Sequence, residues 1–193
     1  WWASRREMQL THAGAVGTEN GAVLLVGGGG AGKSTTSLAC LNAGLDFFGD
    51  DYCLVTAGPE ARVHGVYATA KLRPEALALL PALAPNVRNA GRLQREKAIL
   101  DFPESVTARL AGGAQIHAIV APRVTGRVYV QPITPGAVLR AMAPSTIFGL
   151  FGATPGSLAN LAHLADCVPG YRLELSSDVD AVVDVIASLL QAP

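Results

Sequence analysis

Charge is scarce in this sequence, and neither sign is in excess. Lys and Arg together number 15, Asp and Glu also number 15, and the formal net charge at neutral pH is zero. Proteins that bind nucleic acid or anionic membranes work through a surplus of positive charge. We therefore expect neither nucleic acid nor a membrane among the partners of this chain.

Long hydrophobic runs are also missing, although half of the residues are apolar. No run approaches the roughly 18 residues of a membrane-spanning helix, and no secretory signal peptide is evident. We expect a cytoplasmic protein. The chain begins with Trp1 rather than Met, which leaves open a further segment before it. A length of 193 residues suits one domain with a real core, and we treat residues 1–193 as a single catalytic domain.

Cysteine is rare, and the spacing of the three cysteines excludes the usual cysteine frameworks. Cys40, Cys53 and Cys167 are odd in number, far apart and set in apolar surroundings. No CxxC pair and no Cys/His ligand spacing is present, so we expect neither disulfides nor a zinc site. Reduced thiols in the core of a cytosolic protein are the simplest interpretation.

Glycine, by contrast, is concentrated in one place. Residues 27–34 read GGGGAGKS and match the phosphate-binding pattern G-x-x-x-x-G-K-[ST] at every defined position. A short apolar strand is expected over 22–26, and a helix over 34–43 that ends at Gly44. Strand, glycine loop and helix direct backbone N–H groups and a helix N-terminus at one point, which favours bound phosphate.

The nucleotide-binding residues follow from this pattern. Lys33 is expected to reach the β- and γ-phosphates, and the Ser34 hydroxyl to bind Mg²⁺. We predict that Mg²⁺ and a nucleoside triphosphate bind here. The predicted binding residues in and beside the loop are Gly28, Gly29, Gly30, Ala31, Gly32, Lys33, Ser34 and Thr35.

A hairpin is expected to bring a histidine to the same place. The Asn-Gly pair at 20–21 is a strong turn signal, so strands over about 8–17 and 22–26 should pair. His12 would then stand near the γ-phosphate, although it lies far from Lys33 in sequence. A strand histidine with an ordinary hydrogen bond is the alternative.

Two adjacent carboxylates follow the next buried strand. Residues 45–49 read as that strand, and Asp50 and Asp51 come directly after it. Ligands of parallel α/β sheets sit at the carboxyl ends of strands, and a carboxylate pair there is suited to Mg²⁺ with nucleotide. Further on, Lys71 and Arg73 occupy alternate positions before a helix that begins at Pro74. They are candidates for binding phosphate or substrate, and a solvated pair on a loop is the alternative.

The remaining elements indicate an α/β fold with at least seven strands. Residues 81–95 have no clear period and read as a long lid or binding loop. Strands are expected over 96–102, 115–121, 127–133 and 171–175. Helices are expected over 137–142, 145–151 and 157–168, followed by a C-terminal amphipathic helix capped by Ser177.

A phosphate loop does not by itself reveal the fate of the γ-phosphate. Transfer requires positioning, charge neutralisation and a group that takes the proton of the acceptor. We predict Asp50 as that base, Asp51 as a metal ligand, and Lys33 and His12 as further catalytic residues; the two aspartates could also exchange or share roles. A regulatory ATPase or switch, and a small-molecule kinase, are the alternatives.

The order of His12, the loop with Lys33 and Ser34, and the pair Asp50 and Asp51 resembles the HPr kinase/phosphorylase family. The resemblance covers residues 10–56. It implies the phosphoenolpyruvate carboxykinase-like P-loop fold, with a mixed central sheet flanked by helices, and ATP with Mg²⁺. It also implies that Asp50 is the acid/base residue, that Asp51 and Ser34 bind the metal, and that His12 lies beside the phosphates.

The resemblance also bears on the acceptor. Thr35 replaces an acidic residue common in bifunctional members, and residues 68–73 stand where the family has a Glu-Ile-Arg-Gly-Leu-Gly segment. The chain is therefore more similar to the HPr-kinase-like serine kinases outside sugar regulation, including enzymes that phosphorylate lasso peptides. The implied partner is a protein or peptide that carries a serine, and the family often forms homo-oligomers.

Overall fold

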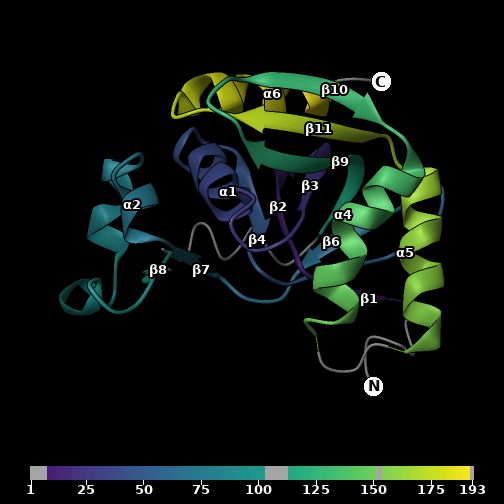
Figure 1. Ribbon diagram of the computed structural model, residues 1–193, viewed down its shortest axis with the longest axis horizontal. Helices are drawn as coiled ribbons and strands as arrows, with labels where there is room; N and C mark the ends of the chain where they lie inside the picture. Colours follow the sequence, from purple (N-terminus) through teal and green to yellow (C-terminus); the bar gives the residue numbers. More distant parts are fainter. Residues whose placement is uncertain (1–7, 103–112, 151–153, 192–193) are drawn as a thin grey trace.

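The strand that leads into the glycine-rich loop lies inside a mixed sheet with helices on both faces (Figure 1). The computed structural model describes residues 8–102, 113–150 and 154–191. The described strands are β1 (Gln9–Thr11), β2 (Ala13–Thr18), β3 (Gly21–Val26), β4 (Asp46–Gly49), β5 (Cys53–Val55), β6 (Arg62–Gly65), β7 (Thr69–Leu72), β8 (Ala98–Asp101), β9 (Ala114–Val124), β10 (Tyr129–Ile133) and β11 (Gly170–Leu175).

The helices and shorter helical segments connect these strands. They are α1 (Lys33–Asn42), α2 (Pro74–Leu77), the 3₁₀ segments η2 (Pro81–Asn86) and η3 (Ala90–Arg92), α4 (Pro135–Ile147), α5 (Pro155–Cys167) and α6 (Val179–Gln191). In the described part of the chain, no helix has the length and apolar character needed to cross a membrane.

The sheet is parallel at its centre and antiparallel on either side. Its strand order is β1-β5-β6-β9-β3-β2-β4, and β11 and β10 extend it beyond the second half of β9. Strand β3 runs parallel to β9, which runs parallel to β11. Strand β2 is antiparallel to both β3 and β4, so β3 and β4 point in the same direction.

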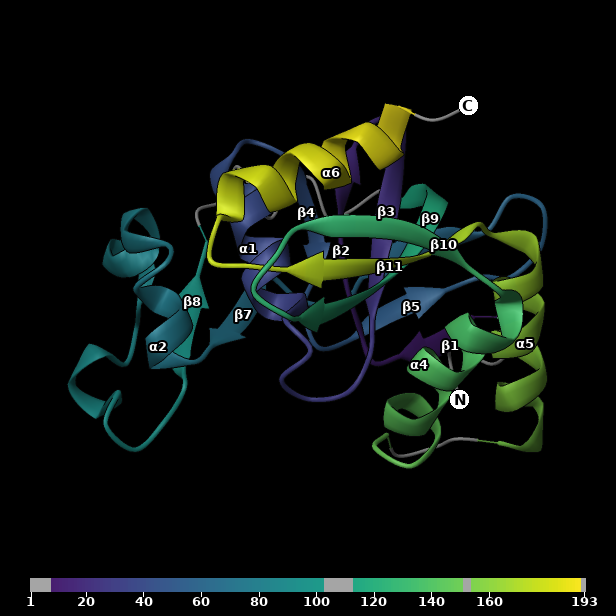
Figure 2. The same cartoon turned by 45° about the horizontal axis from the view of Figure 1, so that its top comes forward.

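Successive side chains of the central strands point to opposite faces of the sheet, and this produces two hydrophobic cores. In β3, Val23 and Leu25 pack with α1 and α6, whereas Leu24 and Val26 pack on the opposite face with α4 and α5. Figure 2 shows α6 and α1 together, with α4 and α5 at the other side of the sheet. A strand covered on both faces needs to be apolar throughout, as 22–26 is. The predicted α/β class with a mixed sheet flanked by helices is confirmed.

A second, small sheet forms an arm (residues 69–101) beside α1. Strands β7 and β8 pair antiparallel, and α2, η2 and η3 lie between them in sequence. The long loop predicted over 81–95 thus contains two short 3₁₀ segments, η2 and η3. Buried Asn89 donates from Nδ2 to the carbonyl of Lys97 at 2.9 Å and accepts from the amide of Ile99 at 2.8 Å. These hydrogen bonds hold the arm's turn to β8.

Some sequence predictions need correction in the C-terminal part. The helices predicted over 137–142 and 145–151 are one helix, α4, which contains Pro144. Pro144 is on an exposed face, where water can satisfy the carbonyl that lacks an N–H partner. The predicted end at residue 151 lies outside the described residues. Asp178, rather than Ser177, accepts a hydrogen bond from the Ala181 amide at 3.0 Å and caps α6.

Other corrections concern strand limits and one cysteine. The strand predicted over 8–17 is divided at His12 into β1 and β2, and β1 pairs with β5 instead of β3. Strand β9 continues to Val124, so its link to β10 is shorter than predicted. Cys40 and Cys53 are buried free thiols as expected, but Cys167 is exposed on α5.

Candidate active site

Three strand ends bring the predicted site residues to one edge of the sheet. Strand β3 ends at Val26, directly before the glycine loop, and β4 ends at Gly49, directly before Asp50. Strand β2 lies between them and runs the opposite way, so its first residue is at the same edge. His12 immediately precedes β2 and therefore joins the loop and the two aspartates.

The glycine loop has a backbone that other residues rarely adopt. The φ angles of Gly27, Gly30 and Gly32 are 138°, 84° and 105°. These values lie in the region where a Cβ atom is strained, so glycine is needed at these positions. At Gly32 there is also no space, because an added Cβ would lie 2.3 Å from Cδ1 of Leu175. The end of β11 thus packs directly on the loop.

We expect Gly32→Ala to distort the loop, because the backbone strain and the clash with Leu175 act together. The variant should lose about 1–3 kcal/mol of stability and bind nucleotide weakly. Gly28→Ala is the matched control for stability, since an added Cβ there meets nothing within 4 Å. Chemical denaturation of both variants checks this, and equal stability of the two would contradict it.

The Lys33 side chain bonds to the backbone of the glycine loop. Its Nζ donates to the carbonyl of Gly27 at 2.7 Å and to that of Gly28 at 3.1 Å. The side chain is buried, and this burial lowers the pKa of the ammonium group, although Asp50 and Asp51 act in the opposite direction. A cation held in the mouth of a phosphate loop is placed to exchange carbonyl oxygens for phosphate oxygens.

Asp50 is almost fully buried, with 1% of its surface exposed. Its Oδ2 accepts a weak hydrogen bond from the Lys71 amide at 3.4 Å, and its Oδ1 has no hydrogen-bond partner among the described residues. Burial, and next the charge of Asp51, raise its pKa to about 6, although the Ser34 hydroxyl opposes this shift. Such a carboxyl group accepts a proton near neutral pH.

Asp51 differs from its neighbour in conformation and environment. Its φ angle is 66°, and no other described non-glycine residue has a positive φ. This left-handed turn lets the two adjacent carboxylates occupy different surroundings. Oδ1 of Asp51 lies 3.6 Å from Nε2 of His12. His12 in the first place, and then Lys97 and Lys71, lower the pKa of Asp51, so this carboxylate stays ionised.

Helix α4 holds the backbone of His12 in place. Its backbone N–H donates to the hydroxyl of buried Thr146 at 3.1 Å. Its Nδ1 is buried and has no partner among the described residues. The Ser145 hydroxyl of the same helix donates to the carbonyl of Gly27 at 3.4 Å. Helix α4 therefore ties the histidine to the start of the glycine loop.

A cleft of about 250 Å³ joins these groups. Its lining residues are His12, Gly29, Gly30, Ala31, Gly32, Lys33, Ser34, Thr35, Asp51, Lys71, Leu72, Arg73, Ala76, Lys97 and Val124. Gly28 does not line this cleft and contributes its carbonyl to Lys33 instead. Asp50 lines a separate hollow of about 240 Å³, which shares Asp51 and Lys71 with the cleft.

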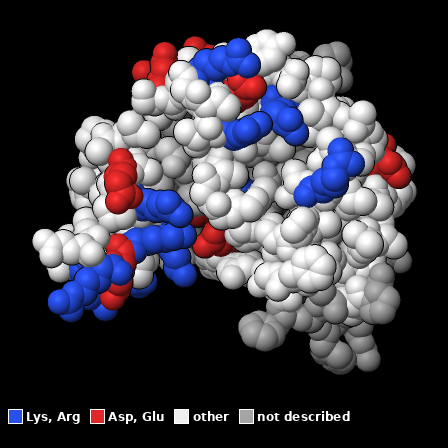
Figure 3. Space-filling model, in the orientation of Figure 1, with Lys and Arg blue, Asp and Glu red and all other residues white. Residues whose placement is uncertain are grey.

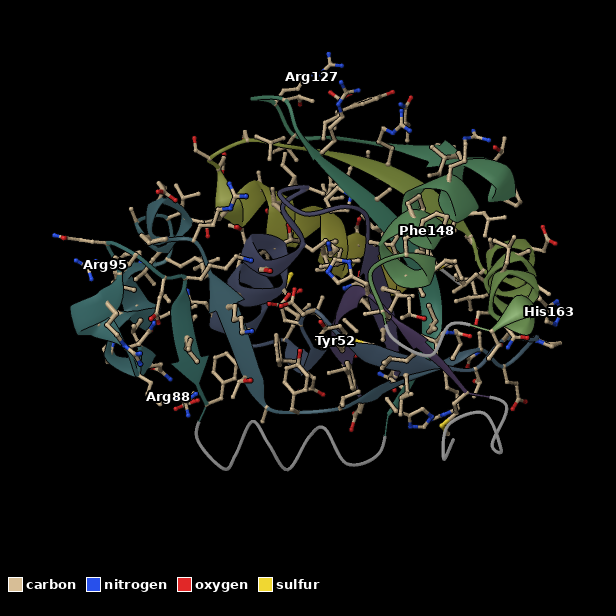
Figure 4. All side chains as sticks on the ribbon, turned by 60° about the horizontal axis from the view of Figure 1, so that its bottom comes forward. Tyr52, Arg88, Arg95, Arg127, Phe148 and His163 are labelled. Atoms are coloured by element: carbon tan, nitrogen blue, oxygen red, sulfur yellow. The ribbon has the colours of Figure 1, made fainter. Side chains whose placement is uncertain are left out.

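Lys97 is a site residue that sequence reasoning missed. It directly precedes β8, whose first residue, Ala98, pairs with Leu72 at the end of β7. The sequence predicts a strand over 96–102 but none over residues 69–72, so it offers no basis for pairing β7 with β8. Lys and Arg side chains gather where the arm meets the central hollow (Figure 3). Arg88 and Arg95 point outward from the arm, whereas Tyr52 is near the centre of this face (Figure 4).

Comparison with solved structures finds proteins with a similar course of the chain. No family model matches the sequence, and no curated protein matches it. The fold is similar to the HPr(Ser) kinase/phosphatase from Coxiella burnetii, with a TM-score of 0.48 and 11% sequence identity. The alignment covers 95% of this chain and 94% of that chain. A likeness this distant carries no information about function.

Proposed function

We propose that this protein is an ATP-dependent kinase that transfers the γ-phosphate to a hydroxyl group, with a serine of a protein or peptide as the acceptor. The observation that carries the proposal is the buried Oδ1 of Asp50, which has no partner among the described residues although it lies beside the phosphate loop. An unpartnered buried acceptor is costly unless a ligand uses it. Asp50 also lines a hollow from which the hydroxyl of an acceptor can approach this carboxyl group.

The transfer step assigns a task to each group. The acceptor oxygen forms a bond to the γ-phosphorus, the bond from that phosphorus to the β–γ bridging oxygen breaks, and ADP leaves. The proton of the acceptor hydroxyl passes to Asp50. Lys33 shifts from the carbonyls of Gly27 and Gly28 to the phosphates, where it balances developing negative charge.

The oxygen donors present fit Mg²⁺. Asp51 stays ionised, and its carboxylate lines the cleft with the Ser34 hydroxyl. Magnesium commonly binds one or two protein oxygens and completes its shell with phosphate and water. No group of three His, Cys, Asp or Glu residues in the described ranges forms a cage for a metal alone. Bound Mg²⁺ would neutralise phosphate charge, with Asp51 and Ser34 as its protein ligands.

The remaining predicted residues have supporting tasks in this scheme. His12 orients the Asp51 carboxylate through the 3.6 Å contact between Nε2 and Oδ1. Lys71, Arg73 and Lys97 line the cleft from the arm and offer positive charge to the phosphate chain. The terminal Nη2 of Arg73 lies 3.8 Å from the position of a Cβ atom at Gly30, so the guanidinium is over the loop.

The hollow beside Asp50 is the entry that we assign to the acceptor. It is lined by Tyr52, Tyr67, Thr69 and Lys71 in addition to the two aspartates and Ala70. The Tyr67 hydroxyl donates to the backbone carbonyl of Asp50 at 3.0 Å, and burial raises its pKa, so it stays protonated. Two aromatic rings at this entry suit a peptide chain that delivers a serine hydroxyl.

The test compares phosphate release with phosphate transfer. Incubation with γ-labelled ATP, Mg²⁺ and a library of serine peptides should label specific peptides, and replacement of the serine by alanine should abolish the label. Steady phosphate release that no acceptor stimulates would instead favour a regulatory ATPase. Label on a small molecule alone would favour the small-molecule kinase.

A further inference from the structure

A second cavity opens on the other side of the phosphate loop. It has a volume of about 490 Å³, which falls in the usual range for ligand sites of roughly 300–1,000 Å³. Its lining residues come from α1 and α2, the ends of β9 and β11, the start of α6, and the residues next to these elements.

The chemical character of this cavity is opposite to that of the phosphate cleft. Neither Lys nor Arg is among its described lining residues, and Glu75 is the one charged side chain there. Aliphatic side chains form both walls: Ala76 of α2 and Leu79, which follows α2, on one side, and Leu175 and Val182 on the other. In Figure 2, α2 lies to the left of α1. Strand β11 points toward the same side, and α6 begins there.

The two cavities are next to each other. Gly32, Thr35, Ala76 and Val124 line both of them. His12, Asp51 and Lys71 lie at the phosphate end, whereas Thr35 begins the side of α1 that faces the apolar cavity. A ligand with a polyanionic chain at one end and a flat apolar ring at the other spans this pair of cavities.

We infer that the apolar cavity binds the purine base and ribose of the nucleoside triphosphate, between α2 and the β11–α6 junction. This inference rests on the proposed function and adds a site that the glycine pattern does not define. The base lies between aliphatic side chains, which remove its faces from water. Glu75 accepts hydrogen bonds from amino or ring N–H groups on the edge of the base, and the hydroxyls of Ser176 and Ser177 lie at the rim.

If the base binds in the apolar cavity, substitutions there should weaken the binding of nucleotide without weakening the binding of phosphate groups. Val179→Trp fills the cavity from one wall, and Leu79→Asp places a charge on the other; neither residue lines the phosphate cleft. Both variants should bind Mg-ATP about tenfold or more weakly, yet bind inorganic tripolyphosphate with Mg²⁺ as the unchanged protein does. Leu158→Asp, at another exposed leucine, on α5, is the control and should leave both affinities unchanged.

Calorimetry with ATP, GTP and tripolyphosphate distinguishes the outcomes. Equal loss for ATP and tripolyphosphate in both wall variants would overturn the inference, as would wild-type protein that binds ATP no more tightly than tripolyphosphate. Failure of the kinase proposal looks different: the nucleotide affinities change as expected, but no acceptor is labelled. The ratio of ATP to GTP affinity should change in Glu75→Gln, because the two bases present different edges to the carboxylate.

Discussion

Asp50→Asn is expected to lower the rate of phosphate transfer by about 10²–10⁴-fold, the usual contribution of a general base. Asparagine has nearly the same shape but cannot take the proton of the acceptor. Nucleotide affinity should change little, because Asp50 lies behind the phosphate cleft rather than in its wall. Single-turnover labelling of an acceptor and equilibrium titration with Mg-ATP measure the two quantities separately.

The same variant should change the pH dependence of stability in metal-free protein. Burial raises the pKa of Asp50 to about 6 from an ordinary value of 3.8. Asp50 therefore binds its proton more tightly in the folded than in the unfolded state, so its own contribution to stability is fully present below about pH 4 and is lost as the pH rises through 6. At about 1.4 kcal/mol per pKa unit, the loss approaches about 3 kcal/mol. Asp50→Asn should remove this slope.

Asp166→Asn, at an exposed carboxylate on α5, is the matched control and should change neither transfer nor the pH slope. The groups around Asp50 also titrate, so the unfolding free energies are compared between variants at each pH in the presence of a chelator. A variant that loses nucleotide binding but retains turnover would contradict the assignment of Asp50 as the base. Unchanged pH dependence would contradict the burial argument.

Lys33→Met is expected to weaken Mg-ATP binding by about a hundredfold or more. Each charge-assisted hydrogen bond contributes about 1.5–3 kcal/mol, and the ammonium group can donate several to the phosphates. The fold should persist, since methionine retains the length of the side chain and removes a buried charge. The variant does leave the carbonyls of Gly27 and Gly28 without their present donor.

Lys71→Met provides the comparison for Lys33. Lys71 lines the same cleft but is exposed, so its loss should weaken binding far less, by about tenfold at most. Titration with Mg-ATP, together with thermal unfolding of both variants, checks the order of effects. Equal affinities for Lys33→Met and the unchanged protein would show that the loop does not bind phosphate through this lysine.

Local sequence was sufficient for the donor side of the site. The pattern of residues 27–34 sets the loop, because three of its glycines adopt φ angles that other residues avoid. The apolar run 22–26 and the Asn-Gly turn set the strand and its hairpin partner; the pairing is confirmed for residues 13–18, whereas residues 9–11 pair with β5. The glycine pattern, the apolar run and the turn each depend on the conformational preferences of a few neighbouring residues. Such preferences can be predicted from the sequence alone.

The different roles of Asp50 and Asp51 depend on the tertiary structure. In sequence they are equivalent neighbours, and only the left-handed turn at Asp51 sends one carboxylate into the core and the other toward His12. Lys97 reaches the cleft only because β8 pairs with β7 across a long segment. Such pairings depend on contacts between distant residues, whose free energy no local pattern encodes.

The sequence by itself thus determined the α/β class, the phosphate loop, and the candidate histidine and carboxylates of the site. The tertiary structure decided which carboxylate is buried, which cations complete the cleft and where an apolar cavity adjoins it. The physical reason is burial: the packing of β4, the arm and α6 around the loop sets the local exposure to water. That exposure determines the charge state of Asp50 and the apolar character of the second cavity.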